Sequence, residues 1–248
     1  MGARTIGLDV SFWQDYNGTP QQIDFVKTKN NGAYYVIIRA SQDVYADSDW
    51  EYNWYESKKA GLLRGAYHFF DYRKAAAPQA KFFARLMIED RAELPPALDL
   101  EKHRDWPLPP RRNMLLAIET FIHTFEDVYG AKPLFYTNPS MLRYYLKPVP
   151  DWLMEYDLWI AHYLKNPEDR EPYFAPWDKW TFWQFTDRGD GKAYGMESKQ
   201  VDVNYFNGSL EDLKKYAGGE EVTPPHVDLT LEEKVEILWD AFPHLHPR

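Results

Sequence analysis

The chain has 248 residues, of which 44% are hydrophobic and 27% charged, a balance typical of a folded globular protein and not of a disordered one. It contains no cysteine, which excludes thiol nucleophiles, disulfides and cysteine-bound zinc or iron–sulfur centres. With 38 acidic and 29 basic residues the net charge is −9, which argues against nucleic acid or an anionic membrane as the main partner.

The start of the chain has no apolar run ahead of the residues that resemble a first core strand, so no secretory signal is recognised there. No segment approaches the roughly 18 to 20 apolar residues of a membrane helix. We therefore expect a soluble protein without membrane insertion, made in the cytoplasm and either released from the cell or exported by another route.

Short apolar runs alternate with helix-like segments over the first two-thirds of the chain. β-Branched and aromatic residues predict strands over residues 5–11, 34–40, 63–70, 96–101 and 134–137. Apolar residues at helical spacing predict helices over residues 21–30, 47–60, 75–88 and 111–129. This alternation is typical of βα units that build a parallel sheet.

After about residue 155 the helical patterns fade while the strand signals continue. Three further strands are predicted over residues 158–163, 181–186 and 201–206. Between them, prolines predict a loop over residues 165–179 and glycines a long hairpin turn over residues 187–199. A short helix follows over residues 209–216. We expect an α/β fold, a barrel that begins as βα units and closes with strands that lack intervening helices.

The predicted barrel domain covers residues 1–218 and is followed by a tail. Residues 219–229 have the composition of a linker, and residues 230–248 begin with a capping-box pattern and predict a short amphipathic helix. One interpretation is a terminal helix that packs on the core. The other is an appendage that docks a partner or mediates oligomerisation, since a helix this short is marginally stable alone.

Acidic residues lie at the ends of several predicted strands. Asp9 ends the first, Asp99 and Glu101 end the fourth, and Asp202 lies in the last. Sites in βα barrels are built where the parallel strands end. Asp99 and Glu101 are two residues apart, so they share one face of the strand, about 6.6 Å apart along the chain.

This pair has the spacing and chemistry of a glycosidase site. Two carboxylates divide the work: one, protonated, donates to the leaving oxygen, and the other, ionised, stabilises positive charge at the sugar carbon. The carboxyl groups are roughly 5 Å apart where one of them attacks the sugar, and 6.5 to 9.5 Å apart where a water enters between them. The expected separation is near both distances, so it does not distinguish these two mechanisms. A single aspartate after a strand is more often a helix cap, but acids at several strand ends together favour a site.

Two histidines, His68 and His162, lie within strand-like runs. Either could hydrogen-bond a sugar, although a hydrogen-bonded core histidine is the more common case. Neither has the spacing of a metal ligand, and we expect no metal site. The sequence contains no glycine-rich nucleotide loop and no serine-hydrolase motif.

Six short motifs occur together in the order and spacing of a known family. They are Gly7-Leu-Asp-Val-Ser11, Gly65-Ala-Tyr-His-Phe69, Ala97-Leu-Asp-Leu-Glu101, Leu158-Trp-Ile-Ala161, Trp183-Gln-Phe-Thr186 and Val201-Asp-Val-Asn204. In these motifs the chain resembles glycoside hydrolase family 25, the Chalaropsis-type lysozymes, over about residues 5–216. The resemblance implies an irregular, flattened TIM-like barrel that cleaves peptidoglycan at the β-1,4 bond between N-acetylmuramic acid and N-acetylglucosamine, without metal or cofactor.

The resemblance also assigns roles to residues. Glu101 is similar in position to the family's general acid and Asp99 to its partner carboxylate, with Asp9 and Asp202 as supporting acids. The resemblance is compatible with two mechanisms, in which either Asp99 or the substrate's own N-acetyl group attacks the sugar carbon. The resemblance further implies sugar contacts for three aromatic residues, Tyr67, Tyr136 and Trp183, with core packing as the alternative for the tryptophan.

Two other functions compete with a muramidase. A chitin-type glycosidase would need a longer acidic strand motif, and Leu94 and Ala97 stand at two of its positions. A catalytically silent wall-binding or virion protein could keep the barrel, because a fold does not guarantee a function. Against that, all four acids are present.

For the setting, we expect a phage or prophage endolysin that acts on the bacterial cell wall.

Overall fold

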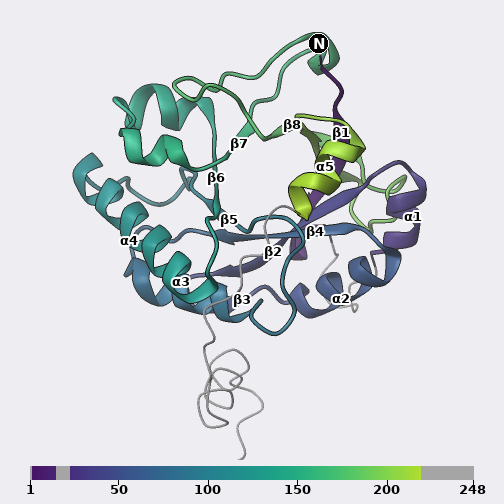
Figure 1. The fold of residues 1–248 in the computed structure, drawn as a ribbon, viewed down its shortest axis with the longest axis horizontal. Helices are drawn as coiled ribbons and strands as arrows, with labels where there is room; N and C mark the ends of the chain where they lie inside the picture. Colours follow the sequence, from purple (N-terminus) through teal and green to yellow (C-terminus); the bar gives the residue numbers. More distant parts are fainter. Residues whose placement is uncertain (1, 15–22, 219–248) are drawn as a thin grey trace, which may run out of the picture.

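The computed structural model describes residues 2–14 and 23–218. Nine strands form one sheet (Figure 1). Their bounds are β1 Thr5–Val10, β2 Tyr35–Gln42, β3 Tyr45–Ala46, β4 Leu63–Phe69, β5 Ala97–Asp99, β6 Leu134–Thr137, β7 Leu158–Ala161, β8 Phe182–Asp190 and β9 Gln200–Phe206. The helices are α1 Phe25–Asn30, α2 Trp50–Ala60, α3 Ala76–Arg85, α4 Arg111–Tyr129 and α5 Leu210–Ala217.

Eight of these strands close into a barrel. Their order is β1, β9, β8, β7, β6, β5, β4 and β2, and a pairing of β1 with β2 completes the ring. Seven of the eight run parallel, and β9 runs antiparallel to both of its neighbours. The short strand β3 is added to β2 as a hairpin outside the ring. The expected irregular α/β barrel is confirmed.

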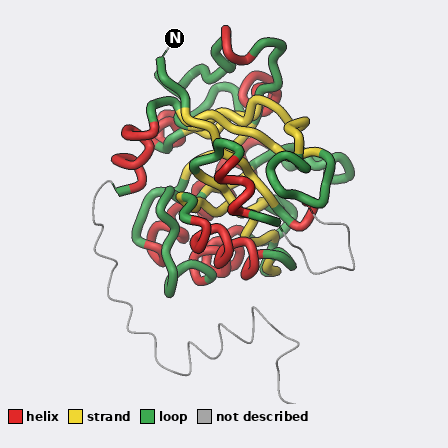
Figure 2. The backbone as a smooth tube through the Cα atoms, turned by 90° about the vertical axis from the view of Figure 1, so that its right-hand side faces the viewer, coloured by secondary structure: helices red, strands yellow, loops and turns green. Residues whose placement is uncertain are grey.

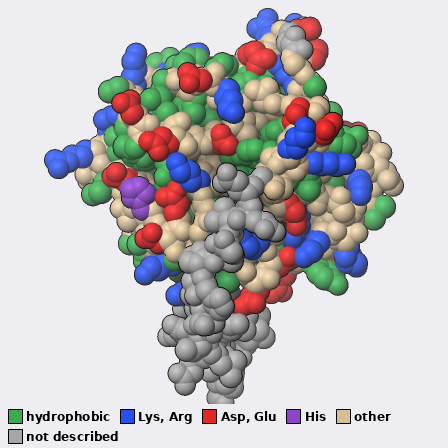
Figure 3. Space-filling model, viewed as in Figure 1, with side chains coloured by type: hydrophobic (Ala, Val, Ile, Leu, Met, Phe, Trp, Pro, Cys, Tyr) green, Lys and Arg blue, Asp and Glu red, His purple; other side chains and the backbone are tan. Residues whose placement is uncertain are grey.

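The helices lie around the outside of the strands (Figure 2). In Figure 1, α3 and α4 lie side by side to the left of the sheet, and α1 and α2 lie to the right. Both α2 and α4 end at a glycine in the left-handed conformation, Gly61 and Gly130. A glycine adopts this conformation without the steric cost that a side chain would add. On the face seen in Figure 3, acidic and basic side chains are interspersed.

The second half of the barrel differs in detail from the prediction. Short helical turns at residues 141–145 and 151–155 connect β6 to β7, where no helix was predicted. Strand β8 continues to Asp190, so the connection to β9 is shorter than the predicted turn over residues 187–199. Beyond the rim of the barrel the extended strand pairs only with its hairpin partner and is not packed against a core. Its residues therefore do not show the alternation of apolar and polar residues from which a strand is predicted.

Side chains along each barrel strand alternate between two hydrophobic cores, as a strand's period of two requires. The outward-facing residues pack against the helices, and the inward-facing residues form a smaller core inside the ring. The inner core includes Tyr35, Ile37, Leu134, Trp159 and Phe182. Helix α5 closes the end where the parallel strands begin, with Leu213 in this inner core. The opposite end, where the parallel strands finish, is left for polar side chains.

The inner core is crowded at the contact between β1 and β2. Gly7 of β1 lies opposite Tyr35 of β2, whose ring fills the space that a side chain on Gly7 would need. The ring is fully buried, so it has no room to move aside without displacing its neighbours. Gly7 is therefore required by close packing and not by its backbone angles.

Two parts of the prediction lie outside the described residues. These are the beginning of the predicted first helix, residues 21 and 22, and the tail with its linker over 219–229 and its helix over 230–248. Within residues 2–14 and 23–218, no helix has both the length and the apolar composition needed to cross a membrane.

We predict that Gly7→Ala destabilises the fold by about 1 to 3 kcal/mol, because the added methyl group overlaps the buried ring of Tyr35. Urea unfolding of the two proteins measures the difference. Gly2→Ala is the matched control, since a methyl group at Gly2 meets no atom within 4 Å. Equal midpoints for Gly7→Ala and the wild type would show that the inner core can relax around the extra atom.

Candidate active site

A cavity of about 210 Å³ opens at the end of the barrel where the parallel strands finish. Its walls are formed by residues from all eight barrel strands and from the segments directly after some of them. The lining residues are Asp9, Ser11, Trp13, Gln14, Arg39, Tyr67, Phe69, Asp99, Glu101, Tyr136, Trp159, Tyr163, Gln184 and Asp202. Six of the nine residues predicted for a site are therefore brought together: the four acids, Tyr67 and Tyr136.

Asp9 is held at the back of the cavity by two amide side chains. Its Oδ2 accepts hydrogen bonds from Gln184 Nε2 at 2.9 Å and from Asn204 Nδ2 at 2.7 Å. Each amide is oriented by further donors on its own oxygen. Trp159 Nε1 donates to Asn204 Oδ1, at 2.8 Å. The hydroxyls of two tyrosines, Tyr136 and Tyr163, donate to Gln184 Oε1, at 3.1 and 2.7 Å. This network fixes which end of each amide faces the carboxylate.

Asp202 faces Asp9 across the antiparallel strands β9 and β1, where the two residues are direct partners. Burial raises the pKa of Asp202 above its usual range, and the negative charge of Asp9 adds to the effect. Burial also raises the pKa of Asp9, but hydrogen bonds from Gln184, Asn204 and Asp202 oppose it. Because hydrogen bonds oppose the rise at Asp9 and charge adds to it at Asp202, these effects favour the proton on Asp202 and the negative charge on Asp9.

Asp99 and Glu101 form a second acidic pair, at the end of β5 and just after it. Burial and then the charge of Glu101 raise the pKa of Asp99 well above its usual range. Burial and then the charge of Asp9 raise the pKa of Glu101. Asp99 Oδ1 is buried and has no hydrogen-bond partner among the described residues. A buried carboxylate oxygen left unpaired at a cavity is a candidate for contact with a reacting group.

Among the residues that the structure describes, Arg39 is the one basic residue that lines this cavity. Its guanidinium lies between two aromatic rings, 5.3 Å from the centre of Phe12 and 5.4 Å from that of Phe69. Gln42 and Asp47 hold its outer side, Gln42 by a hydrogen bond and Asp47 at 3.7 Å. From this position its charge lowers the pKa of both Asp99 and Glu101, against the effect of burial.

Two exposed aromatic residues stand at the rim of the cavity. Trp13 is 66% exposed and Tyr163 is 52% exposed, and both line the opening. An exposed aromatic ring beside a polar cavity provides a flat apolar surface with an amphipathic edge, which suits stacking against a sugar ring. The half-buried Tyr67 and the buried Tyr136 also line the cavity, together with the acids.

Three of the predicted contacts face away from the cavity. Trp183 is fully buried in the outer core, and its Nε1 donates to the carbonyl of His162. His68 is buried between strands and helices, where Ser41 and Gln79 hydrogen-bond its ring, and burial lowers its pKa to about 3. The ring of His162 accepts the backbone N–H of Tyr173.

The physical reason is the same in each case. In all three segments the neighbouring residue in the strand faces the cavity: Tyr67 beside His68, Tyr163 beside His162 and Gln184 beside Trp183. A shift of one residue moves a side chain to the opposite face. At these three positions the residue predicted from the sequence is the neighbour of the residue that lines the cavity.

The sequence did not predict the cavity residues Arg39, Tyr163, Gln184 and Trp13, nor Asn204, which hydrogen-bonds Asp9 from outside the cavity. Alternation from Trp159 would have found Tyr163, and alternation from Asp202 would have found Asn204. No pattern in the sequence distinguishes Arg39 from an ordinary basic residue at a strand end. Among residues 2–14 and 23–218, no group of three or more acidic or histidine side chains is arranged to hold a metal ion.

We predict that Asp202→Asn stabilises the protein, and by about 2 kcal/mol more at pH 8 than at pH 5. The raised pKa keeps Asp202 protonated in the folded state, whereas the unfolded chain ionises near pH 4. The unfolded state therefore binds fewer protons, and the stability of the wild type falls as the pH rises. Urea unfolding at both pH values measures this, with the exposed Asp178→Asn as control. A gain independent of pH would contradict the raised pKa.

We predict that Arg39→Gln moves the whole pH–rate profile of the enzyme to higher pH, because the positive charge that lowers the pKa of Asp99 and Glu101 is removed. Arg39→Lys keeps the charge and serves as the matched control, with a profile near that of the wild type. Rates of reducing-end release between pH 4 and 9 provide the measurement. An unchanged profile for Arg39→Gln would exclude an electrostatic effect of this residue on the acids.

The chain was compared with known proteins and structures. The family model described as glycosyl hydrolases family 25 matches residues 8–193. The uncharacterized protein YegX of Escherichia coli strain K12 is 30% identical over 224 residues, which are 88% of this chain and 75% of that protein. An N,O-diacetylmuramidase of a Chalaropsis species is 28% identical over 225 residues, 86% of this chain and 99% of that protein.

Among solved structures, a bacterial lysozyme from Streptomyces coelicolor superposes with a TM-score of 0.72 at 26% identity, over 88% of this chain and 97% of that one. The matched family segment begins at the strand that carries Asp9 and includes Asp99, Glu101 and Gln184. The family match covers well over half of the chain, and the fold of the solved relative agrees with it. The chain therefore belongs to glycosyl hydrolases family 25 and is a glycoside hydrolase of the lysozyme type.

Proposed function

We propose that this protein is an N-acetylmuramidase that cleaves the β-1,4 bond between N-acetylmuramic acid and N-acetylglucosamine in peptidoglycan. One observation carries the proposal: the same-face pair of Asp99 and Glu101 shares a single cavity with the cross-strand pair of Asp9 and Asp202. Family membership and the resemblance to an N,O-diacetylmuramidase support the choice of bond.

In the proposed reaction Glu101 is the general acid. Its raised pKa favours the protonated form, and it is less deeply buried than Asp99, so it is accessible to the leaving oxygen of a bound glycan. As the bond to the leaving sugar breaks, the proton moves from Glu101 to that oxygen. Water then restores the hydroxyl at the sugar carbon and returns a proton to the enzyme.

Asp99 is the proposed partner that meets the positive charge at the sugar carbon. Its carboxylate form, which the nearby charge of Arg39 favours against the effect of burial, presents the unpaired Oδ1 to the cation that develops at the sugar carbon. The interaction is thus stronger in the transition state than in the free enzyme. Both direct attack by Asp99 and orientation of the substrate's N-acetyl group are compatible with this role.

Asp9 and Asp202 are proposed to set the charge of the site. The pair carries one negative charge, on Asp9, and that charge raises the pKa of Glu101. The amides of Gln184 and Asn204 keep Asp9 in place while the reacting pair changes protonation. In this proposal the supporting pair keeps the general acid protonated at the pH of the reaction.

The proposed setting is bacterial wall lysis by a phage or prophage endolysin. The position of the gene tests this part: genes for holins or virion proteins beside it would support the setting, and a neighbourhood of ordinary bacterial wall genes would overturn it. The wall-cleaving activity itself does not depend on this outcome.

We predict that Glu101→Gln lowers the rate of peptidoglycan digestion at least 100-fold, because the amide cannot donate the proton that the leaving oxygen needs. The measurement is release of fragments from purified peptidoglycan, with reduction and mass analysis to identify the sugar at the new reducing end. Glu51→Gln, on the exposed side of α2, makes the same chemical change away from the cavity and is the matched control.

Three outcomes are informative. Fragments ending in N-acetylmuramic acid from the wild type and the control alone support both the bond and the acid. Near-normal activity of Glu101→Gln overturns its assignment. If the wild type binds the wall and releases nothing, the protein is a catalytically silent binding module on the same barrel.

A further inference from the structure

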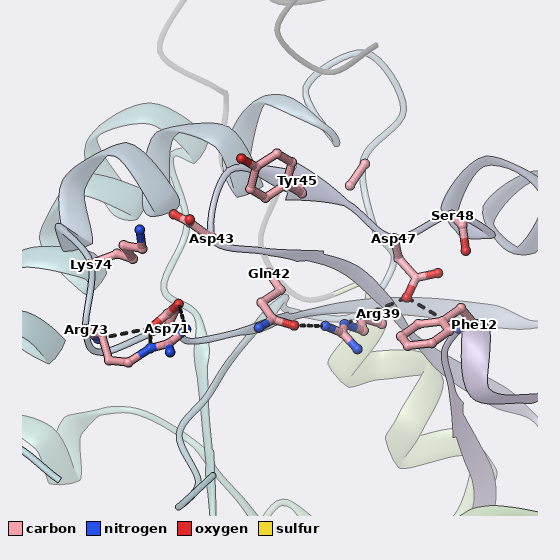
Figure 4. Close-up of a pocket in the computed structure, with 11 residues that line it drawn as sticks. Phe12, Arg39, Gln42, Asp43, Tyr45, Asp47, Ser48, Asp71, Arg73 and Lys74 are labelled. Carbon is pink, nitrogen blue, oxygen red and sulfur yellow. Dashed lines mark hydrogen bonds and ion pairs between the residues drawn. The ribbon is translucent and has the colours of Figure 1, made fainter. Parts of the chain in front are cut away.

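A second cavity, of about 500 Å³, adjoins the active site (Figure 4). It lies between the β2–β3 hairpin and the segment after β4, and it shares Arg39 with the acidic cavity. Phe12 lines the second cavity and Phe69 the first, one on each side of the Arg39 guanidinium. A part of the substrate that extends from the reacting sugar on this side would therefore pass Arg39 and enter the second cavity.

The second cavity is lined by charges of both signs. Two of its cations already have carboxylate partners inside the protein. Arg73 binds Asp71 through two nitrogens, at 2.7 and 2.8 Å, and Arg39 lies 3.7 Å from Asp47. The charge of each of these cations is thus opposed by a carboxylate of the protein itself.

Two further charged side chains in the wall have no such partner. Lys74 and Asp43 make no side-chain hydrogen bond and no ion pair with any described residue, although both line the cavity. In Figure 4 they lie together at the end away from Arg39 and Phe12. Asp43 occupies the hairpin turn with a φ of 51°, a left-handed conformation that aspartate and asparagine tolerate better than most residues. One positive and one negative group, neither of them in a hydrogen bond or an ion pair with a described residue, thus line the same cavity.

On the other side of the active site the lining is different. A cavity there shares Tyr163 with the acidic cavity and is lined mainly by apolar and aromatic residues: Leu164, Pro167 and Phe185 with Tyr163. Its two charged residues, Asp187 and Arg188, lie 3.6 Å apart. Apolar faces suit neutral sugar rings, whereas free charges of both signs suit a zwitterionic group.

We propose that the cavity of Lys74 and Asp43 binds the stem peptide of peptidoglycan, with Lys74 facing a stem carboxylate and Asp43 the amino group of its diamino acid. This inference rests on the proposed function. The stem is attached through the lactyl group of N-acetylmuramic acid, so it begins within one sugar ring of the bond that is cut. It is also the part of the polymer that carries both carboxylates and an amine, the charges that these two residues complement.

The test compares two substrates for each protein. One is peptidoglycan with intact stems, and the other is the same glycan after an amidase has removed the stem peptides. The stripped strands keep a lactyl carboxylate at the sugar but lose the amine and the distal carboxylates. The wild type should cut the intact glycan with the higher kcat/KM. Lys74→Glu and Asp43→Asn should each lower kcat/KM on the intact glycan, by about fivefold for the charge reversal, and change it less than twofold on the stripped glycan.

Lys81→Glu is the matched control, because it makes the same charge reversal on the exposed side of α3, away from the cavity. For Lys81→Glu, the ratio of kcat/KM on the intact glycan to kcat/KM on the stripped glycan should equal that of the wild type. Asn at position 43 tolerates the left-handed turn, so the backbone is preserved in that variant. Melting temperatures of all variants report whether the fold is intact.

The inference would be overturned if Lys74→Glu and Asp43→Asn had the same ratio of kcat/KM on intact and stripped glycan as Lys81→Glu. An equal loss on both glycans would also overturn it, because the cavity would then bind sugar. A wild type that cuts neither glycan would instead refute the proposed function. The two failures are therefore distinguishable in one set of measurements.

Discussion

Asp9 and Asp202 face each other across the antiparallel pair of β1 and β9, the pairing through which the last strand closes the barrel onto the first. The other barrel strands run parallel and bring their ends to one rim, where they add Asp99 and Glu101 to the same cavity. Without the pairing of β1 with β9, Asp202 would not face Asp9, and these two acids would not share a cavity with Asp99 and Glu101. The site is thus a consequence of how the chain ends its sheet.

Such a concentration of buried acids costs stability, because every acid in the cavity has a pKa raised by burial. The fold offsets part of the cost with neutral donors and a single cation. Gln184 and Asn204 supply hydrogen bonds to Asp9, and Arg39 supplies positive charge from between two rings. Amides stabilise a carboxylate without cancelling its charge, so Asp9 can still raise the pKa of Glu101. This division fits a site where function is kept at the expense of stability.

Much of the fold could be predicted from local patterns. Helix α4 and strand β6 have the predicted bounds, because a long amphipathic helix and a short buried strand are defined by their own residues. The acids at strand ends could be predicted for the same reason, since alternation places Asp99 and Glu101 on one face. For Trp183 the sequence left a sugar contact and core packing as alternatives, because an aromatic residue in a strand suits either face. The closed barrel places Trp183 in the outer core and Gln184 at the cavity.

The sequence predicts most of the strands and helices and the spacing of the paired acids, since these depend on residues near one another along the chain. It also carried the six motifs that identify the family. Which charges meet depends on the closed barrel: the pairing of Asp9 with Asp202, the place of Arg39 between Phe12 and Phe69, and the charges of Lys74 and Asp43 beside the active site. A pKa or a binding surface depends on distances between segments remote in sequence, and those distances exist only once the barrel has closed.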